Sequence, residues 1–471
     1  MSDSSHAKLY TLPVLRLTKV SDAPGPRCLP IQHRHKSHTV KYWREQEIDN
    51  RARWKSFPKF PLVLNADGSP WAPACLYLLE KALLKPQAMS SLTSLAQGLK
   101  DYRNFLHGYE LEWDDFSAVD KYLRPTYLYK TFLQDQIHAG LLKPSTASRR
   151  VSTVMSFYRF LMSSTRMQFA PANEPWEETK GSFAYRDARG FKQVVEVAKT
   201  NLAIRVPKSD YAFDETIRDG GKLRPLTIEE QRQLIAALKV LGNPEYELMH
   251  YITLLTGARK QTVLTLRVEH FLPSPSDIKS WPLKLRCGPG TGIDTKLDRS
   301  GVHLVISQHL YTKLHVYVKS ERAQHRRRKS RWGDDPHNYV FLTQHGNPYY
   351  EAKEDIHAER EFTAMLRSSK TAQGLFQFIK NEVIPEVRKC NPTFNYKFHD
   401  LRATFGLNWV DHVLGEDGAK EKYLWAREQL RKLMWHKDAT TTDRYLEYRH
   451  HLHHLKKAQE GWNQHLLDLI A

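Results

Sequence analysis

Cysteine is scarce in this sequence of 471 residues, and its few cysteines lie far apart. They form no C-x-x-C pair, and their spacing matches no disulfide framework of a small secreted domain. Scattered, unpaired cysteines are typical of proteins that fold in a reducing cytosol, so we expect no structural disulfide. The four cysteines are Cys28, Cys75, Cys287 and Cys390.

Metal-ligand patterns of standard spacing are also missing. Cys28 is followed by His33, His35 and His38, but this spacing matches no common zinc motif. The histidines between residues 450 and 454 resemble a metal patch only superficially. We therefore expect no metal site, and we interpret the first histidine-rich stretch as part of a basic arm.

Long apolar runs and phosphate-binding loops are absent as well. No run of about 18 apolar residues is present, so no transmembrane helix is expected. The N-terminal segment lacks the apolar core and the small-residue cleavage site of a signal peptide. The glycine-rich stretch at 288–292 is not followed by G-K-[ST], which excludes a loop of the Walker type. These absences predict a cytoplasmic protein that does not bind membranes.

Positive charge, in contrast, is in excess. The 71 lysines and arginines outnumber the 52 aspartates and glutamates, which gives a formal net charge of +19. An excess of this size predicts a polyanionic partner, and nucleic acid is the first candidate. A basic protein without such a partner is the alternative. The length exceeds that of one ordinary domain and predicts two or three.

The N-terminal part divides into a region that is hard to assign and a helical region. We expect residues 1–72 to form an N-terminal arm or small accessory region, with a helix over 41–57 and a short strand that ends at a D-G turn. Residues 73–166 place apolar side chains at three- and four-residue spacing throughout, which predicts helices. Arg149 and Arg150 fall in the first turn of the last of these helices, where the helix dipole disfavours cations. A bound phosphate would offset that cost; a helical bundle with exposed arginines is the alternative.

The following segment, residues 167–225, is rich in proline, glycine and charge. Because a structureless loop of this length is unusual inside one domain, we interpret it as an interdomain linker with a helix over 191–204. A compact domain is then expected over 226–445. Thr227 and Glu230 predict a capping box at its first helix.

Two polar clusters lie near the end of this domain. The first is an H-x-x-R formed by His399 and Arg402, and the second is His436 followed nine residues later by Tyr445. An arginine fork holds two oxygens of a phosphate, and a histidine transfers protons near neutral pH. A tyrosine hydroxyl can act as a nucleophile, although its ordinary pKa near ~10 means that it needs help. Together these residue types suit the cleavage of a phosphodiester.

The order of these motifs resembles the catalytic signature of the tyrosine recombinases, the phage-integrase family. That signature is an arginine after a T-G turn, a lysine on a β-hairpin, H-x-x-R, a second histidine or tryptophan, and the tyrosine. In this sequence Arg259 follows Thr256-Gly257, and Lys296 precedes the strand-like stretch 302–306. Lys284 is the nearest rival for the lysine.

Two positions depart from the family pattern. The family commonly has an acidic residue three positions after its first arginine, where this sequence has Thr262, so the support of Arg259 is expected to differ. The family usually has glycine before the second histidine, where this sequence has Trp435. Tyr448 is a rival nucleophile by position, but it lacks the T-T-x-x-Y approach that precedes Tyr445.

The resemblance implies a fold that is mainly α with a small β-sheet in the catalytic domain. Residues 73–166 would be the helical core-binding domain, which lies across one face of DNA. Residues 226–445 would be the mixed α+β catalytic domain of a tyrosine recombinase.

The resemblance also implies a mechanism without cofactor or metal. The tyrosine attacks a DNA phosphodiester and forms a 3′-phosphotyrosyl link, while the two arginines hold the non-bridging oxygens. The first histidine is the candidate base, the lysine is the candidate acid for the leaving 5′-oxygen, and the second histidine hydrogen-bonds the scissile phosphate. The implied catalytic residues are Arg259, Lys296, His399, Arg402, His436 and Tyr445.

A cationic run between residues 322 and 331 is a further candidate DNA contact. Like charges this close together repel unless something neutralises them, and DNA phosphates could do so. A solvated loop is the alternative. The residues expected to contact DNA here are Arg326, Arg327, Arg328 and Lys329.

The partners implied by the resemblance are double-stranded DNA recombination sites, a homotetramer on paired sites, and accessory DNA-bending proteins at a bacterial nucleoid. Residues 446–471 form an amphipathic helix candidate that would dock on a neighbouring protomer, or else on its own domain. Two other functions remain: DNA relaxation of the type IB topoisomerase kind, and DNA binding without catalysis. The helical domain favours the recombinase over the former, and the filled catalytic positions argue against the latter.

Overall fold

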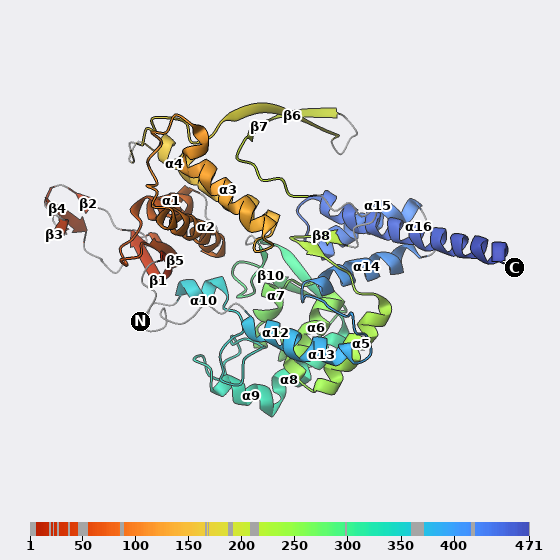
Figure 1. The fold of residues 1–471 in the computed structure, drawn as a ribbon. Coiled ribbons are helices and arrows are strands. Elements are labelled where there is room, and N and C mark those ends of the chain that lie inside the picture. Colours follow the sequence, from red (N-terminus) through yellow and green to blue (C-terminus); the bar gives the residue numbers. More distant parts are fainter. Residues whose placement is uncertain are drawn as a thin grey trace. The chain divides into compact units, whose positions relative to one another are not determined.

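The computed structural model folds into two compact units, one formed by the described residues up to 207 and one by those from 216 onward (Figure 1). Each unit has its own hydrophobic core. The structure describes residues 6–470 except 18–19, 22, 26–27, 36–37, 46–54, 85–88, 165–166, 168, 187–191, 208–215, 297–298, 359–371 and 416–419.

The first unit begins with strands. Strand β1 (Lys8–Leu17) pairs antiparallel with β5 (Lys55–Leu64). A separate three-stranded sheet has the order β2-β4-β3, formed by β2 (Val20–Ser21), β4 (His38–Glu45) and β3 (Cys28–His35). The predicted helix over 41–57 is therefore wrong, because β4 and β5 occupy its two described ends. Valine and the aromatic residues of these segments favour a pleated surface over a helix.

The predicted strand before the D-G turn is confirmed. Strand β5 ends at Leu64, and the turn that follows contains Gly68 at a φ of +84°, a conformation that glycine adopts without strain. Phe60 and Val63 of this strand are buried in the same core as the helices that follow.

The helices predicted over 73–166 are confirmed. Pro125 and Pro144 stand in the first turns of the last two helices, where the missing amide hydrogen costs nothing. The core contains several buried tyrosines, and the hydroxyls of Tyr102 and Tyr158 are hydrogen-bonded at 2.8 Å. The helices are α1 (Ala72–Leu84), α2 (Met89–Gly108), the short η1 (Lys121–Leu123), α3 (Pro125–His138) and α4 (Pro144–Ser163).

The helix predicted over 191–204 is wrong. Strands β6 (Glu178–Arg186) and β7 (Lys192–Thr200) pair antiparallel in this segment. Valines at 194, 195 and 197 explain the difference, since β-branched residues favour strands over helices.

The second unit opens with a small hairpin and a helical layer. Strands β8 (Ile217–Arg218) and β9 (Lys222–Leu223) pair antiparallel around a tight turn. The predicted capping box of Thr227 and Glu230 is confirmed at the start of the next helix. The helices that follow are α5 (Ile228–Leu241), α6 (Pro244–Thr256), α7 (Lys260–Leu264), η2 (Val268–Phe271) and η3 (Pro275–Asp277).

A β-hairpin and a second set of helices complete this unit. Strands β10 (Leu283–Cys287) and β11 (Val302–Ile306) pair antiparallel, as predicted for the hairpin near Lys296. Strand β8 lies beside the first part of the long last helix (Figure 1). The helices are α8 (Gln308–Lys319), α9 (Glu321–Arg328), α10 (Lys353–Ala358), α12 (Gln373–Phe378), η5 (Ile379–Val383), α13 (Ile384–Arg388), α14 (Asp400–Leu414), α15 (Lys420–Leu433) and α16 (Ala439–Ile470).

The predicted fold class is confirmed: the chain is mainly helical, and its sheets are small and antiparallel. Among the described residues, no helix combines the length and the apolar character that crossing a membrane requires.

Candidate active site

Four of the predicted catalytic side chains converge on one buried carboxylate, that of Asp219. Arg402 Nε donates to its Oδ2 at 2.8 Å, the Tyr445 hydroxyl donates to the same oxygen at 3.3 Å, and His436 Nε2 lies 3.2 Å from it. Arg259 Nη2 lies 3.4 Å from Oδ1. Residues from distant parts of the second unit therefore surround a single anion.

Arg402 is the most deeply fixed of these groups. It stands in the first turn of α14 and is only 1% exposed. Besides the Asp219 carboxylate, its guanidinium donates to the main-chain carbonyls of Gly257 and Met434. The end of α6 and the end of α15 are thereby tied to α14, which holds the guanidinium in one orientation.

Arg259 enters the site because the chain turns sharply at Gly257. This glycine ends α6 at a φ of +67°, and a Cβ there would lie 2.5 Å from the ring of Phe405. Both the conformation and the close approach require glycine. Burial, with the neighbouring charge of Arg402, lowers the pKa of Arg259 to about 10, so it stays cationic at neutral pH.

Thr262 does not support Arg259; it holds the loop that carries Lys296. Its hydroxyl donates to the carbonyl of Asp294 at 2.8 Å. One turn later, the hydroxyl of Thr265 accepts from the amide of Asp294, also at 2.8 Å. These two threonines clamp the backbone just before the lysine, and the carboxylate that contacts Arg259 comes from Asp219 instead.

His399 and Lys296 both lie close to Gly220, the residue after Asp219. A Cβ on Gly220 would be 3.3 Å from Lys296 Nζ and 3.9 Å from His399 Nε2. Burial, followed by the charge of Arg402, lowers the pKa of His399 to about 4, so the imidazole is neutral at neutral pH. Lys284 lies in β10, opposite Val305.

Tyr445 and His436 are oriented as a pair. Tyr445 lies in α16 and is fully buried, and its ring stacks on His436 with centroids 5.7 Å apart. His436 Nδ1 is hydrogen-bonded to the hydroxyl of Thr442 at 2.9 Å. Burial raises the pKa of Tyr445 well above its ordinary value, and the Asp219 charge adds to this effect. Tyr448, the rival nucleophile, packs against a hydrophobic cluster.

Trp435, the residue before His436, has a backbone conformation that glycine adopts more readily than tryptophan. Its φ is +54°, in the left-handed region that a tryptophan rarely adopts. The side chain is buried, and its Nε1 donates to the carbonyl of His303 at 3.1 Å. These contacts offset the backbone strain and leave His436 in place.

The cations and donors around Asp219 keep its carboxyl ionised. Burial by itself raises the pKa of the Asp219 carboxyl, but the hydrogen bond from His436 and the charge of Arg402 outweigh it. The pKa is therefore far below its ordinary range, and the carboxylate stays ionised. Burial lowers the pKa of His436, while Asp219 opposes that shift.

Asp219 is the residue that the sequence analysis missed. It lies in the D-G-G turn between β8 and β9, inside the segment that we interpreted as a linker. An Asp-Gly pair indicates a tight turn. No local pattern indicates that this turn folds onto Arg402, which is 183 residues away.

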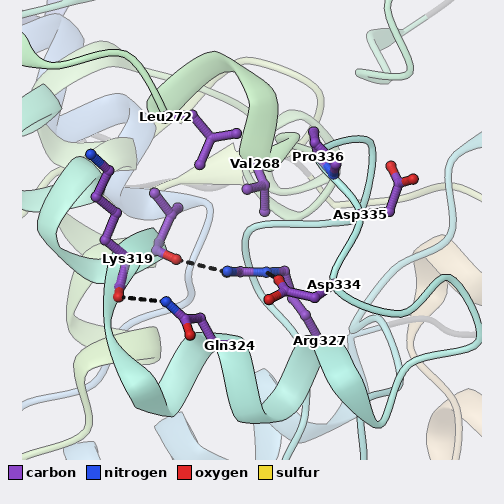
Figure 2. Close-up of a pocket in the computed structure, with 9 residues that line it drawn as sticks. Val268, Leu272, Lys319, Gln324, Arg327, Asp334, Asp335 and Pro336 are labelled. Carbon is purple, nitrogen blue, oxygen red and sulfur yellow. Dashed lines mark hydrogen bonds and ion pairs between the residues drawn. The ribbon is translucent and has the colours of Figure 1, made fainter.

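The expected DNA contact of Arg326 and Arg327 does not fit the structure. The cationic run forms helix α9, and both side chains are buried. Arg326 donates to the carbonyl of Leu342 and pairs with Glu245 at 3.1 Å. Arg327 donates to the carbonyl of Val318 and is paired with Asp334 (Figure 2). Because these contacts use their donors internally, they anchor α9 to the domain.

The other residues predicted to contact DNA differ in their exposure and in their ion pairs. Arg328 and Lys329 are exposed at the end of α9. Arg149 is exposed on α4, whereas Arg150 forms an ion pair with Asp101 at 2.6 Å. Because they are exposed, Arg328, Lys329 and Arg149 are available to a DNA phosphate.

The chain is similar to tyrosine recombinases in sequence. It is 31% identical over 99 residues, 21% of its length, to the tyrosine recombinase XerD of Caulobacter vibrioides. The match spans 28% of that relative's length. It confirms the resemblance that the motifs indicated. No protein-family model matches the chain.

Solved structures of integrases also resemble it. For the Tn1549 transposon integrase in complex with transposon right-end DNA, the TM-score is 0.43 at 15% identity, covering 79% of this chain and 94% of that chain. For a lambda integrase dimer bound to a COC′ core site, the TM-score is 0.40 at 14% identity, covering 80% of this chain and 76% of that chain.

Proposed function

We propose that this protein is a site-specific DNA recombinase of the tyrosine type, which cleaves and rejoins DNA strands through a covalent 3′-phosphotyrosyl intermediate. The observation that carries the proposal is the set of donors around Asp219. Arg259, Arg402, His436 and Tyr445 each lie within 3.4 Å of one singly charged anion. A phosphodiester has the same charge and also offers two oxygens to an arginine fork.

In this mechanism Tyr445 attacks the phosphorus and the 5′-oxygen of the next nucleotide leaves. Arg259 and Arg402 hold the non-bridging oxygens and stabilise the charge that develops in the transition state. His436 donates a hydrogen bond to the same phosphate. The tyrosine stays bonded to the 3′-phosphate until a 5′-hydroxyl attacks it and restores the phosphodiester.

Proton transfers are assigned to His399 and Lys296. His399 is neutral at neutral pH, because its pKa is about 4, and a neutral imidazole can accept the tyrosine proton. Lys296, beside Gly220, can protonate the leaving oxygen. No cofactor enters these steps, since the phosphotyrosine retains the energy of the broken bond.

The partners follow from the same proposal. The net charge of +19 suits binding to double-stranded DNA. Residues 73–166 would be the core-binding domain and 226–445 the catalytic domain, to which the β8–β9 turn, at the end of the expected linker 167–225, contributes Asp219. Two recombination sites would be held by four copies of the chain, with α16 docking between copies. The proposal also includes accessory DNA-bending proteins and binding at a bacterial nucleoid.

The proposal is tested with nicked duplexes made from the DNA that flanks the gene, which trap a covalent intermediate because the released strand diffuses away. Wild-type protein should form a protein–DNA adduct that survives denaturing electrophoresis. Tyr445→Phe should bind DNA and form none, because the change removes only the hydroxyl. Tyr448→Phe is the matched control and should form the adduct. An adduct from Tyr445→Phe contradicts the proposal.

A further inference from the structure

Asp219 occupies the position that the substrate phosphate must take. Its two oxygens accept from the two arginines that the mechanism assigns to the non-bridging oxygens. The hydroxyl of Tyr445, the nucleophile, donates to the same carboxylate. A carboxylate and a phosphodiester cannot share these donors, because both are anions and both need the same guanidinium groups.

We propose that Asp219 is an internal plug, whose carboxylate closes the anion site of the DNA-free protein and must withdraw before a DNA phosphate can enter. This inference rests on the proposed function, because it takes the donors around Asp219 to be the phosphate site. The plug is a segment of the same chain, the turn between β8 and β9.

The turn is built so that its tip can move while its base stays fixed. Ile217 and Leu223, at the base, are buried in a hydrophobic cluster with Tyr445. The carbonyl of Arg218 accepts a hydrogen bond from Arg444 at 2.8 Å. The tip continues into two exposed glycines, the first with a φ of +71°, and glycine changes its backbone angles at little cost.

The turn also lies close to the two groups assigned to proton transfer. A Cβ on Gly220 would be within 4 Å of both Lys296 Nζ and His399 Nε2, the candidate acid and base. Withdrawal of the turn would therefore vacate the anion site and move the backbone away from both groups in one movement.

Closing the site with a carboxylate has two physical consequences. Arg402 is buried and Arg259 is partly buried, and without an anion their charges would be uncompensated, so Asp219 keeps them in place while DNA is absent. The Tyr445 hydroxyl also donates to this carboxylate, so the nucleophile is engaged with Asp219 and not with a phosphate while DNA is absent.

Binding of inorganic sulfate to the full chain tests the plug without DNA. Asp219→Asn removes the charge and keeps the shape, so it should bind sulfate about tenfold or more tightly than wild type, because apparent affinity scales with the fraction of open sites. Asp219→Glu retains a carboxylate and should stay weak. Asp411→Asn is the matched control: it removes a charge from an exposed residue of α14 that pairs with Arg449, and it should behave as wild type. Equal sulfate affinity in wild type and Asp219→Asn overturns the proposal.

Two further readouts separate a plug from a residue that only positions the arginines. On the nicked duplex, Asp219→Asn should form the adduct faster than wild type; a slower rate assigns Asp219 a positioning role and overturns the plug.

Hydrogen exchange is measured on the wild-type protein, so this second test does not depend on whether a variant folds. Amides of residues 218–222 should exchange faster when nicked DNA is bound, and unchanged or slower exchange contradicts withdrawal. Failure of these tests while wild type still forms the Tyr445 adduct leaves the proposed function intact.

Discussion

Gly406 lies directly against the ring of Tyr445. A Cβ at position 406 would be 2.5 Å from Tyr445 Cε1 and 2.9 Å from the sulfur of Met434. Only a glycine in α14 allows α16 to bring its tyrosine this close, so a residue with no side chain sets the position of the proposed nucleophile.

Gly406→Ala should therefore displace Tyr445. We expect adduct formation to slow by about 10- to 100-fold, because a shift of about an ångström is enough to misalign an attacking group. The free energy of unfolding should fall by about 1–3 kcal/mol, the usual cost of overpacking. DNA binding should change little. Gly461→Ala is the control: it lies in the same helix as Tyr445, a Cβ there meets nothing within 4 Å, and its adduct rate should match wild type.

Thr262→Val should weaken the loop that carries Lys296. The change keeps the shape but leaves the carbonyl of Asp294 without its donor, at a cost of about 1–3 kcal/mol in unfolding free energy. Adduct formation should slow, because the lysine loses its support. Thr262→Ser keeps the hydroxyl and should restore both properties.

A modified substrate identifies the step that Thr262 affects. When sulfur replaces the leaving 5′-oxygen, the leaving group needs no proton, and Thr262→Val should then react nearly as fast as wild type. An equal defect on both substrates would contradict a role through Lys296.

His250 should make stability depend on pH. It is fully buried, its Nδ1 donates to the carbonyl of Tyr246 at 2.6 Å, and its Nε2 accepts from the hydroxyl of Tyr396 at 2.8 Å. Burial lowers the pKa of His250 to about 4, below its unfolded value, so the unfolded chain binds the proton first. Stability is then lost as pH falls from about 6.5 towards 4, by about 3 kcal/mol for this residue.

Urea unfolding at several pH values checks this prediction. His250→Gln has no titrating group, so its stability should fall less steeply than that of wild type between pH 6.5 and 4.5. Parallel pH profiles of the two proteins would show that His250 does not carry the effect.

Arg326 should matter for folding, because it neutralises a buried acid. Glu245 is fully buried and pairs with Arg326 and Arg322. Arg326→Ala removes one of these cations and should reduce the free energy of unfolding by about 3 kcal/mol, within the range for broken buried pairs. Arg328→Ala, two positions along the same helix and exposed, should stay within about 0.5 kcal/mol of wild type. A large effect of Arg328 on stability would contradict this division.

The features that could be predicted correctly from the sequence are those that depend on local patterns of residues. The helices over 73–166 follow from apolar residues spaced three and four apart, and the capping box of Thr227 and Glu230 is a local hydrogen-bond pattern. Gly257 predicted the end of α6, which brings Arg259 to the site.

The features of the fold and the site that the sequence did not predict depend on contacts between distant residues. Strand β7 contains a pattern compatible with a helix, and its pairing with β6 decides the outcome. Arg326 looked like a surface cation because Glu245, its buried partner in the fold, is about 80 residues earlier in the sequence. The contact of Asp219 with Arg402 spans 183 residues, and no spacing rule reaches that far.

The most direct test of the account is to locate the covalent bond to DNA. Wild-type protein is trapped on a nicked duplex from the flanking DNA, digested with trypsin and nuclease, and analysed by fragmentation mass spectrometry. The expected peptide runs from Tyr445 to Arg449 and contains both tyrosines, so fragmentation has to distinguish them. The account predicts a nucleotide linked through its 3′-phosphate to Tyr445. A nucleotide on Tyr448, a link through the 5′-phosphate, or an adduct on another residue would contradict it.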